Sequence, residues 1–224
     1  MAKKIPYGLT DYFRIVTEDF YYVDKTKYIE DLEKTAAFLF LIRPRRFGKS
    51  LFLNMLNCYY DVKYADRFEE LFGNQYIGKH PTAEQGKYLV LRFNFSMVRA
   101  TDDKLEAAFN RHISLETAYF ASVYASYFKP DFQEQLKLIP EAAGRLEYIC
   151  LCAKEQGLSI YLLIDEYDNF TNTILSSKGN DVYHSLTHDS GFYRSFFNVV
   201  KGVTTGAEAP VKRMFITGVS PVTL

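Results

Sequence analysis

The sequence predicts an α/β fold in which helices cover a mainly parallel β-sheet. Short apolar runs alternate along the chain with longer segments whose apolar residues recur at helical spacing. This alternation is typical of parallel sheets, because each parallel strand needs a crossover connection that is usually helical. The 224 residues are 48% hydrophobic, which is enough for one domain with a buried core. We expect that core in residues 35–224, preceded by a lead-in over residues 1–34 that packs on it.

The lead-in should begin with an extended segment and a turn, since Pro6 and Gly8 disfavour regular structure. Thr10-Asp11 is a candidate cap for a short helix, and residues 26–34 have the apolar spacing of a second helix. The continuous apolar run at 37–42 predicts a strand that is buried on both faces. Residues 49–60 predict the helix that follows this strand.

The remaining elements follow the same alternation. The sequence predicts, in chain order, a helical piece at 67–72, a strand at 88–95, a long helix at 102–127, one or two helices within 131–156, a strand at 159–164, a polar loop or mobile helix at 174–189, a helix at 191–201 and a fourth strand within 211–218. A break is expected near Pro140 and Gly144. An α/β sheet rarely stops directly after a strand, so we expect a C-terminally truncated fragment.

Composition narrows the functional classes. The 27 basic and 27 acidic residues cancel, so global charge does not indicate a nucleic-acid or anionic-membrane partner. No apolar run approaches the roughly 20 residues of a membrane span, and the N-terminus lacks the apolar segment of a signal peptide. Three cysteines cannot form a closed disulfide framework, and neither Cys150-Leu151-Cys152 nor the four scattered histidines suggest a metal site. We therefore expect a soluble cytoplasmic protein without a membrane partner.

The segment after the first strand has the ending of a phosphate-binding loop. It contains Arg43, Pro44, Arg45, Arg46, Phe47, Gly48, Lys49 and Ser50. In such a loop Gly48 allows close approach to the phosphates, Lys49 contacts the β- and γ-phosphates, and Ser50 ligates Mg²⁺. Backbone N–H groups of the loop and first helical turn would bind the anion, which makes residues 45–51 candidate ATP contacts.

Arg43 departs from the usual G-x-x-x-x-G-K-[ST] pattern, because it occupies the first glycine position. The alternative is a solvated basic turn in which Ser50 caps a helix. The buried strand before the segment and the amphipathic helix after it favour the phosphate loop, and with it the three-layer sandwich of P-loop NTPases.

Two acids follow the third predicted strand. Asp165 would hold Mg²⁺ directly or through water, and Glu166 would polarise the attacking water as general base, with Lys49 as the second catalytic residue. Alternatively, the two acids begin a polar turn. Asp168 is either a further contact of this site or a turn residue. Thr217 and Ser220, after the fourth strand, are candidates for sensing the γ-phosphate, or they belong to a strand-terminal turn.

These motifs together resemble the bacterial AAA-ATPase-like family. The resemblance rests on the Arg43–Ser50 loop, on Asp165-Glu-Tyr-Asp168, on Ile216-Thr-Gly-Val-Ser220, and on Pro6-Tyr-Gly8 and Tyr22-Val-Asp-Lys-Thr26 in the lead-in. It runs from about residue 5 to the last residue, and in this family the loop with Arg at position 43 is usual. The resemblance implies a P-loop ATPase with an extra strand between the two acid-bearing motifs. It also implies a later ATPase strand, a lid and a C-terminal PD-(D/E)XK nuclease-like domain, none of which this sequence shows.

The leading hypothesis is an ATP-binding module of a larger bacterial protein that hydrolyses ATP with Mg²⁺. The alternative is a nucleotide-binding regulatory or interaction module with little turnover. Coupling to nucleic acid through the absent C-terminal domain rests on the resemblance and on Arg45 and Arg46. Four roles are open for these two arginines. They could stabilise the transferring phosphate, contact nucleic acid or join subunits of a homo-oligomer. Alternatively, they belong to a solvated or salt-bridged loop.

Overall fold

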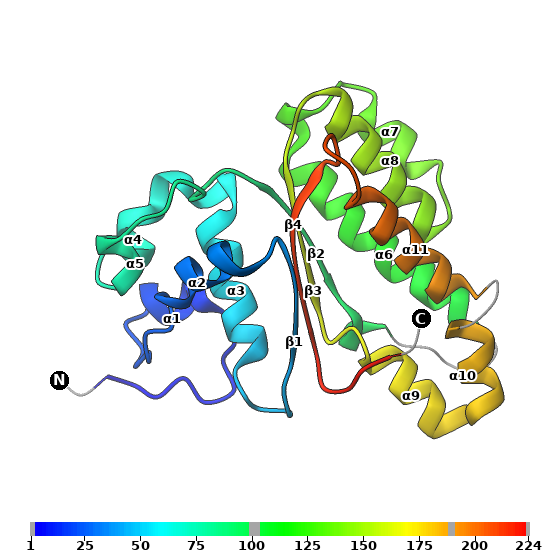
Figure 1. The fold of residues 1–224 in the computed structure, drawn as a ribbon, viewed down its shortest axis with the longest axis horizontal. Coiled ribbons are helices and arrows are strands. Elements are labelled where there is room, and N and C mark those ends of the chain that lie inside the picture. The colour runs from blue at the N-terminus through cyan, green and yellow to red at the C-terminus, as the bar shows by residue number, and fades with distance from the viewer. Residues whose placement is uncertain (1–2, 99–103, 188–190, 223–224) are drawn as a thin grey trace.

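The computed structural model describes residues 3–98, 104–187 and 191–222, which form three layers (Figure 1). The middle layer is a sheet of β1 (Phe38–Ile42), β2 (Leu89–Asn94), β3 (Ile160–Asp165) and β4 (Val211–Gly218). The strands lie in the order β1-β4-β3-β2, and each neighbouring pair is parallel. The α/β class and the four strands expected from the sequence are confirmed.

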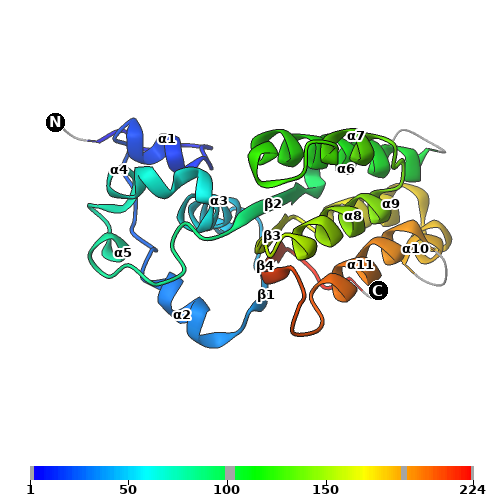
Figure 2. The same ribbon diagram turned by 90° about the horizontal axis from the view of Figure 1, so that it is seen from above.

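Helices cover the two faces of this sheet, as Figure 2 shows from above. One layer contains α1 (Tyr12–Thr17), α2 (Tyr28–Thr35), α3 (Lys49–Tyr60), α4 (Phe68–Phe72) and α5 (Tyr76–Lys79). The other contains α6 (Leu105–Val123), α7 (Phe132–Lys137), α8 (Ala142–Glu155), α9 (Asn169–Lys178), α10 (Asn180–Thr187) and α11 (Phe192–Val203). Short 3-10 turns are η1 (Val62–Arg67), η2 (Phe95–Met97) and η3 (Ala125–Tyr127). No helix of the described ranges is both long and apolar enough to cross a membrane.

Each face of the sheet has its own hydrophobic core, because successive side chains of a strand point to opposite faces. On β3, Leu162 and Ile164 belong to the core shared with α6, α8 and α11, whereas Tyr161 and Leu163 belong to the core shared with α3. All six residues of β3 are buried. The acidic residues at the end of β3 therefore start from a strand that is held on both faces.

The expectation that the first strand is buried on both faces is wrong. Leu39 and Leu41 pack toward α3, but Phe38, Phe40 and Ile42 are 40%, 56% and 38% exposed. β1 is an edge strand of the described sheet, and its neighbour β4 covers only one of its edges. A continuous apolar run does not reveal whether both faces are covered, because that depends on which helices lie over the strand.

Several helices differ in detail from the expectation. The region 131–156 forms two helices, with the break at residues 138–141 around Pro140, while Gly144 lies inside α8. Of the two alternatives for residues 174–189, the described part is helical: α9 ends at Lys178 and α10 follows after Gly179, whose φ is 85°. Residues 188–189 of that segment, and residues 102–103 at the start of the long helix, lie outside the described residues.

The lead-in is fastened to the helices of the α3 layer. Asp11 caps α1, since its side chain accepts a hydrogen bond from the N–H of Arg14. Asp24 accepts a hydrogen bond from the N–H of Tyr76 at 2.7 Å, and the fully buried Thr26 accepts one from Ile77 at 3.1 Å. The Asp24 and Thr26 side chains thus bind the start of α5 and hold the lead-in there.

The difference between β1 and the central strands predicts a difference in stability. Phe93→Ala removes a fully buried ring on β2 and should lower the free energy of unfolding by about 3–5 kcal/mol. Phe40→Ala removes a ring that is 56% exposed and should cost roughly 1 kcal/mol or less. Urea unfolding followed by circular dichroism measures both. Equal losses would show that β1 is covered in solution.

Candidate functional site

The carboxyl ends of β1, β4 and β3 lie side by side at one edge of the sheet. Ile42 is in register with Gly218, and the N–H of Arg43 donates to the carbonyl of Gly218 at 3.1 Å. On the other side of β4, the N–H of Tyr167 donates to the carbonyl of Thr217 at 3.0 Å. The three predicted motifs, far apart in sequence, therefore meet around the end of β4.

The loop between β1 and α3 closes around Lys49. This side chain is only 6% exposed, and its ammonium donates to the carbonyls of Arg43 and Pro44 at 2.9 and 3.0 Å. Arg46 and Gly48 adopt left-handed φ angles of 67° and 76°. Alternating backbone conformations of this kind turn successive N–H groups to the same side and make an anion-binding concavity.

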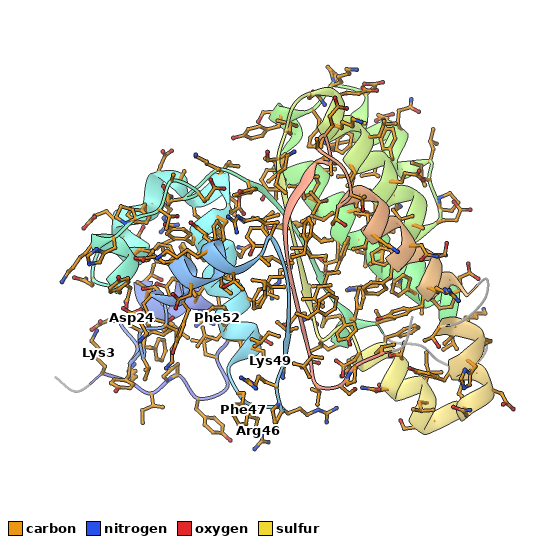
Figure 3. The ribbon with its side chains drawn as sticks, in the orientation of Figure 1. Lys3, Asp24, Arg46, Phe47, Lys49 and Phe52 are labelled. Carbon is orange, nitrogen blue, oxygen red and sulfur yellow. The ribbon has the colours of Figure 1, made fainter. Side chains whose placement is uncertain are left out.

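The outer turn of the loop is exposed. Figure 3 shows Arg46 and Phe47 at the tip and Lys49 behind them, and Phe47 is 68% exposed. Neither Arg45 nor Arg46 forms an ion pair with another described residue. Ser50 and Leu51 lie in the first turn of α3, where helical N–H groups have no intrahelical partner. The loop thus combines a fixed ammonium with free backbone donors, which suits a phosphate chain.

Thr217 joins the two acids at the end of β3. Its hydroxyl is fully buried and donates to Asp165 Oδ1, and it accepts a hydrogen bond from the N–H of Glu166 at 3.3 Å. Asp165 is 1% exposed, and no other side chain of the described residues contacts its second oxygen by a hydrogen bond. Thr217 therefore orients the Asp165 carboxylate in this arrangement.

Glu166 leaves the sheet in a left-handed conformation, with φ 51°. L-residues adopt this conformation only at a cost, and such outliers cluster at functional sites. Its side chain is half-buried and accepts a hydrogen bond from Asn169 at 3.2 Å. The turn directs Glu166 out of the sheet immediately after Asp165.

Asp168 holds the segment that follows β4. This carboxylate is 1% exposed and accepts hydrogen bonds from the N–H groups of Val219 and Ser220, from the Ser220 hydroxyl and from Asn172. Tyr167 also holds the segment after β4, because its hydroxyl donates a hydrogen bond to the Ser220 carbonyl at 3.0 Å. The Ser220 hydroxyl is thereby turned toward Asp168 and Asn172.

Sequence analysis missed a cavity of about 700 Å³ beside the loop of residues 43–50. Its walls come from the loop, from α2, α3, β1 and β4, and from the lead-in; they include Pro6, Tyr21, Tyr22, Val23, Lys25, Tyr28, Phe47, Phe52 and Phe215. Most of these side chains are apolar or aromatic. The available signal for this cavity was the Tyr21-Tyr22 pair, at the start of the lead-in motif Tyr22–Thr26. The sequence does not reveal, however, that this segment folds back beside Lys49.

Sequence analysis also passed over Asn94, which ends β2 in register with Asp165. Its side-chain oxygen accepts hydrogen bonds from the N–H and hydroxyl of Ser96. A polar residue next to the end of the predicted strand 88–95 was the available signal.

The oxygen donors at this edge fit Mg²⁺, which prefers hard oxygen ligands and keeps several waters. Ser50 offers a hydroxyl, and Asp165 offers a carboxylate oxygen. No group of three or more His, Cys, Asp or Glu side chains in the described residues is placed to hold a metal. A magnesium ion at this site would therefore depend on phosphate and water oxygens for most of its ligands.

The cysteines lie away from this edge. Burial raises the pKa of the Cys58 and Cys150 thiols to about 12. A high pKa keeps these thiols protonated, in the form that binds metal poorly.

The hydrogen bonds of Asp168 predict a large cost for its removal. Asp168→Ala would leave the N–H groups of Val219 and Ser220 without the buried carboxylate that accepts from them, and it should lower the free energy of unfolding by roughly 2–5 kcal/mol. Asp66→Ala is the control, since Asp66 is exposed and lacks a side-chain hydrogen bond to any described residue; its effect should stay within about 0.5 kcal/mol. Chemical denaturation compares the two. Similar small losses would show that the segment after β4 does not depend on Asp168.

Comparison with known proteins agrees with these motifs. A family model described as "Predicted AAA-ATPase", that of the AAA-ATPase-like family, matches residues 6–224. A curated relative, an uncharacterized protein in the vnfD 5′ region of Azotobacter chroococcum mcd 1, is 49% identical over 55 residues. That match covers 24% of this chain and only 11% of the relative. No solved structure matches the chain. Since the family model spans nearly all of it, the chain belongs to the AAA-ATPase-like family of predicted AAA-ATPases.

Proposed function

We propose that this chain binds ATP with Mg²⁺ and hydrolyses its terminal phosphoanhydride bond. The observation that supports this most directly is the buried Lys49 ammonium, held by two carbonyls of a loop that contains two left-handed residues. The loop lies at the same sheet edge as Asp165 and Glu166. A solvated basic turn would leave its lysine in water, whereas this lysine is 6% exposed.

In the proposal, the loop binds the phosphates. An ammonium has three N–H donors, and Lys49 gives two of them to Arg43 and Pro44, which leaves one for a phosphate oxygen. Backbone N–H groups of residues 45–51, in the loop and the first turn of α3, would complete the anion contacts. Ser50 and Asp165 would hold Mg²⁺, which neutralises charge on the phosphates when bound.

Glu166 would act on the water that attacks the γ-phosphorus. The water oxygen bonds to phosphorus, the bond to the β,γ-bridging oxygen breaks, and a water proton passes to the Glu166 carboxylate. The products are ADP and inorganic phosphate. The left-handed turn supports this role, because it sets Glu166 beyond Asp165, which itself stays anchored to Thr217.

The cavity beside the loop would hold the nucleoside. Its aromatic walls suit stacking against a flat base, and none of its lining residues is an Asp, Glu, Asn or Gln. Guanine carries adjacent N–H donors, and the lining offers no carboxylate to accept both of them. The lining therefore favours adenine over guanine.

The alternative, a nucleotide-binding regulatory or interaction module, needs the same phosphate loop but little turnover. The Asn169 amide hydrogen-bonds the Glu166 carboxylate, so one of its oxygens is already engaged. Coupling to nucleic acid or assembly into a homo-oligomer would involve the exposed Arg45 and Arg46 at the loop tip.

Substitutions at Lys49 and Glu166 separate binding from turnover. Wild type with Mg·ATP at 100 times the dissociation constant should gain about 2.7 kcal/mol of stability, and Lys49→Ala should lose most of this gain. Glu166→Gln should keep the gain and lower turnover by roughly 10²–10⁴-fold, because the amide cannot accept the water proton. Thermal melting and phosphate release measure the two effects. Normal turnover in Glu166→Gln would disprove the assigned base, and negligible turnover in wild type despite binding would favour the regulatory module.

The nucleoside cavity is tested with a lining residue outside the phosphate loop. Tyr21→Ala removes a ring that is 57% exposed and should weaken ATP binding about 3–10-fold by loss of stacking. Binding of tripolyphosphate should stay unchanged, because it has no base. Tyr127→Ala, a partly exposed tyrosine on η3, is the matched control. Equal affinity of the Tyr21 variant and wild type for ATP would place the base elsewhere.

A further inference from the structure

The second edge of the sheet carries a polar contact that reaches the phosphate loop helix. β2 lies at this edge, beside a cavity of about 430 Å³ between α3 and α6. Asn54, Asn57, Arg92 and Glu116 are among the polar residues that line it. The edge is open because β2 pairs with β3 alone among the described strands, so polar side chains from both helical layers meet there.

Two hydrogen bonds connect β2 to the first turn of α3. Arg92 Nη1 donates to Asn54 Oδ1 at 2.8 Å, and Asn54 Nδ2 donates to the carbonyl of Ser50 at 2.8 Å. Glu116 lines the same cavity, where burial raises the pKa of its carboxyl and the Arg92 charge opposes that rise. The hydrogen bonds therefore run from the strand edge at Arg92 to the helix turn that follows Lys49.

This contact matters because the first turn of α3 has no side-chain cap. The helix starts at Lys49 after Gly48, which has no side chain to cap the free N–H groups. Lys49 fixes the loop on one side through Arg43 and Pro44. Asn54 is the side chain that hydrogen-bonds the Ser50 carbonyl among the described residues, and a planar guanidinium donating to its oxygen limits its rotation.

We propose that Arg92, acting through Asn54, is a positioning residue that sets the Ser50 hydroxyl for Mg²⁺. The inference rests on the proposed function, in which Ser50 is a magnesium ligand. Arg92 touches neither nucleotide nor metal in this role. It orients Asn54, and Asn54 orients the backbone that carries Ser50. Disruption should therefore change the magnesium requirement, whereas contacts of the loop with the phosphates stay intact.

Asn54→Asp separates the two hydrogen bonds. The aspartate keeps an oxygen for Arg92 and loses the N–H that binds the Ser50 carbonyl. Arg92→Met removes the donor to Asn54 while filling similar space, and Arg92 lines an open cavity, so the change leaves no closed void. Asn57→Ala is the matched control, since Asn57 lies one turn later in α3, lines the same cavity and has no side-chain hydrogen bond to the described residues.

The closing experiment has two measurements on the whole chain. In the first, nucleotide binding is titrated with Mg²⁺ and, separately, in EDTA. Asn54→Asp and Arg92→Met should raise the half-saturating Mg²⁺ about 3–10-fold, the worth of one hydrogen bond, and leave ATP affinity in EDTA within twofold of wild type. In the second, amide hydrogen exchange without nucleotide should be about 3–10-fold faster at Phe52–Asn54 in both variants, and unchanged in Asn57→Ala.

The outcomes separate the two proposals. If wild type responds to Mg·ATP but both variants keep its magnesium dependence and exchange rates, the positioning role is wrong and the proposed function stands. If affinity in EDTA falls as much as affinity with Mg²⁺, the contact supports the whole loop and the specific role toward Ser50 is overturned. A wild type that does not bind nucleotide overturns the proposed function, and the positioning role falls with it.

Discussion

The parallel pairing of β4 with β1 on one side and β3 on the other is the constraint on which the site depends. Neighbouring strands lie about 4.8 Å apart, so this order sets the ends of β1 and β3 roughly 10 Å from each other, with Thr217 between them. The loop of residues 43–50 continues directly from β1, and the two acids come directly from β3. The strand register at Ile42 and Gly218 thus fixes the distance between an ammonium and two carboxylates that are far apart in sequence.

Desolvation explains why this edge is fixed. Thr217, Asp165 and Asp168 are all at most 1% exposed, and a buried polar group without a partner costs more than its hydrogen bond contributes when made. Each of the three has a partner from another segment of the chain. The arrangement of β3, β4 and the segments after them therefore has few alternatives of similar energy. The tip of the 43–50 loop differs, since Arg46 and Phe47 are exposed there.

The lead-in adds a wall that the sheet itself does not supply. Asp24 and Thr26 bind the start of α5, and the residues just before them line the cavity next to Lys49. The two edges of the sheet also differ in chemistry. The β1 edge exposes Phe38 and Phe40, whereas the β2 edge collects polar side chains from both helical layers. The first turn of α3 is held from two sides, by Lys49 through Arg43 and Pro44 and by Asn54 through Arg92.

The sequence by itself determined the class of fold, the four strands and most helices, and it supplied the residues that we propose carry the chemistry. Apolar periodicity depends on local spacing, and the Gly48-Lys49-Ser50 and Asp165-Glu166 motifs are local patterns, so one chain suffices to find them. Tertiary structure decided what depends on segments distant in sequence. In the tertiary structure one face of β1 is exposed, and Asp168 and Thr217 have hydrogen-bond partners from other segments. Tyr21 and Tyr22 lie beside the loop, and Arg92 donates a hydrogen bond to Asn54. The physical reason is that burial and hydrogen bonding between distant segments depend on strand order and helix packing, and neither is encoded in the spacing of neighbouring residues.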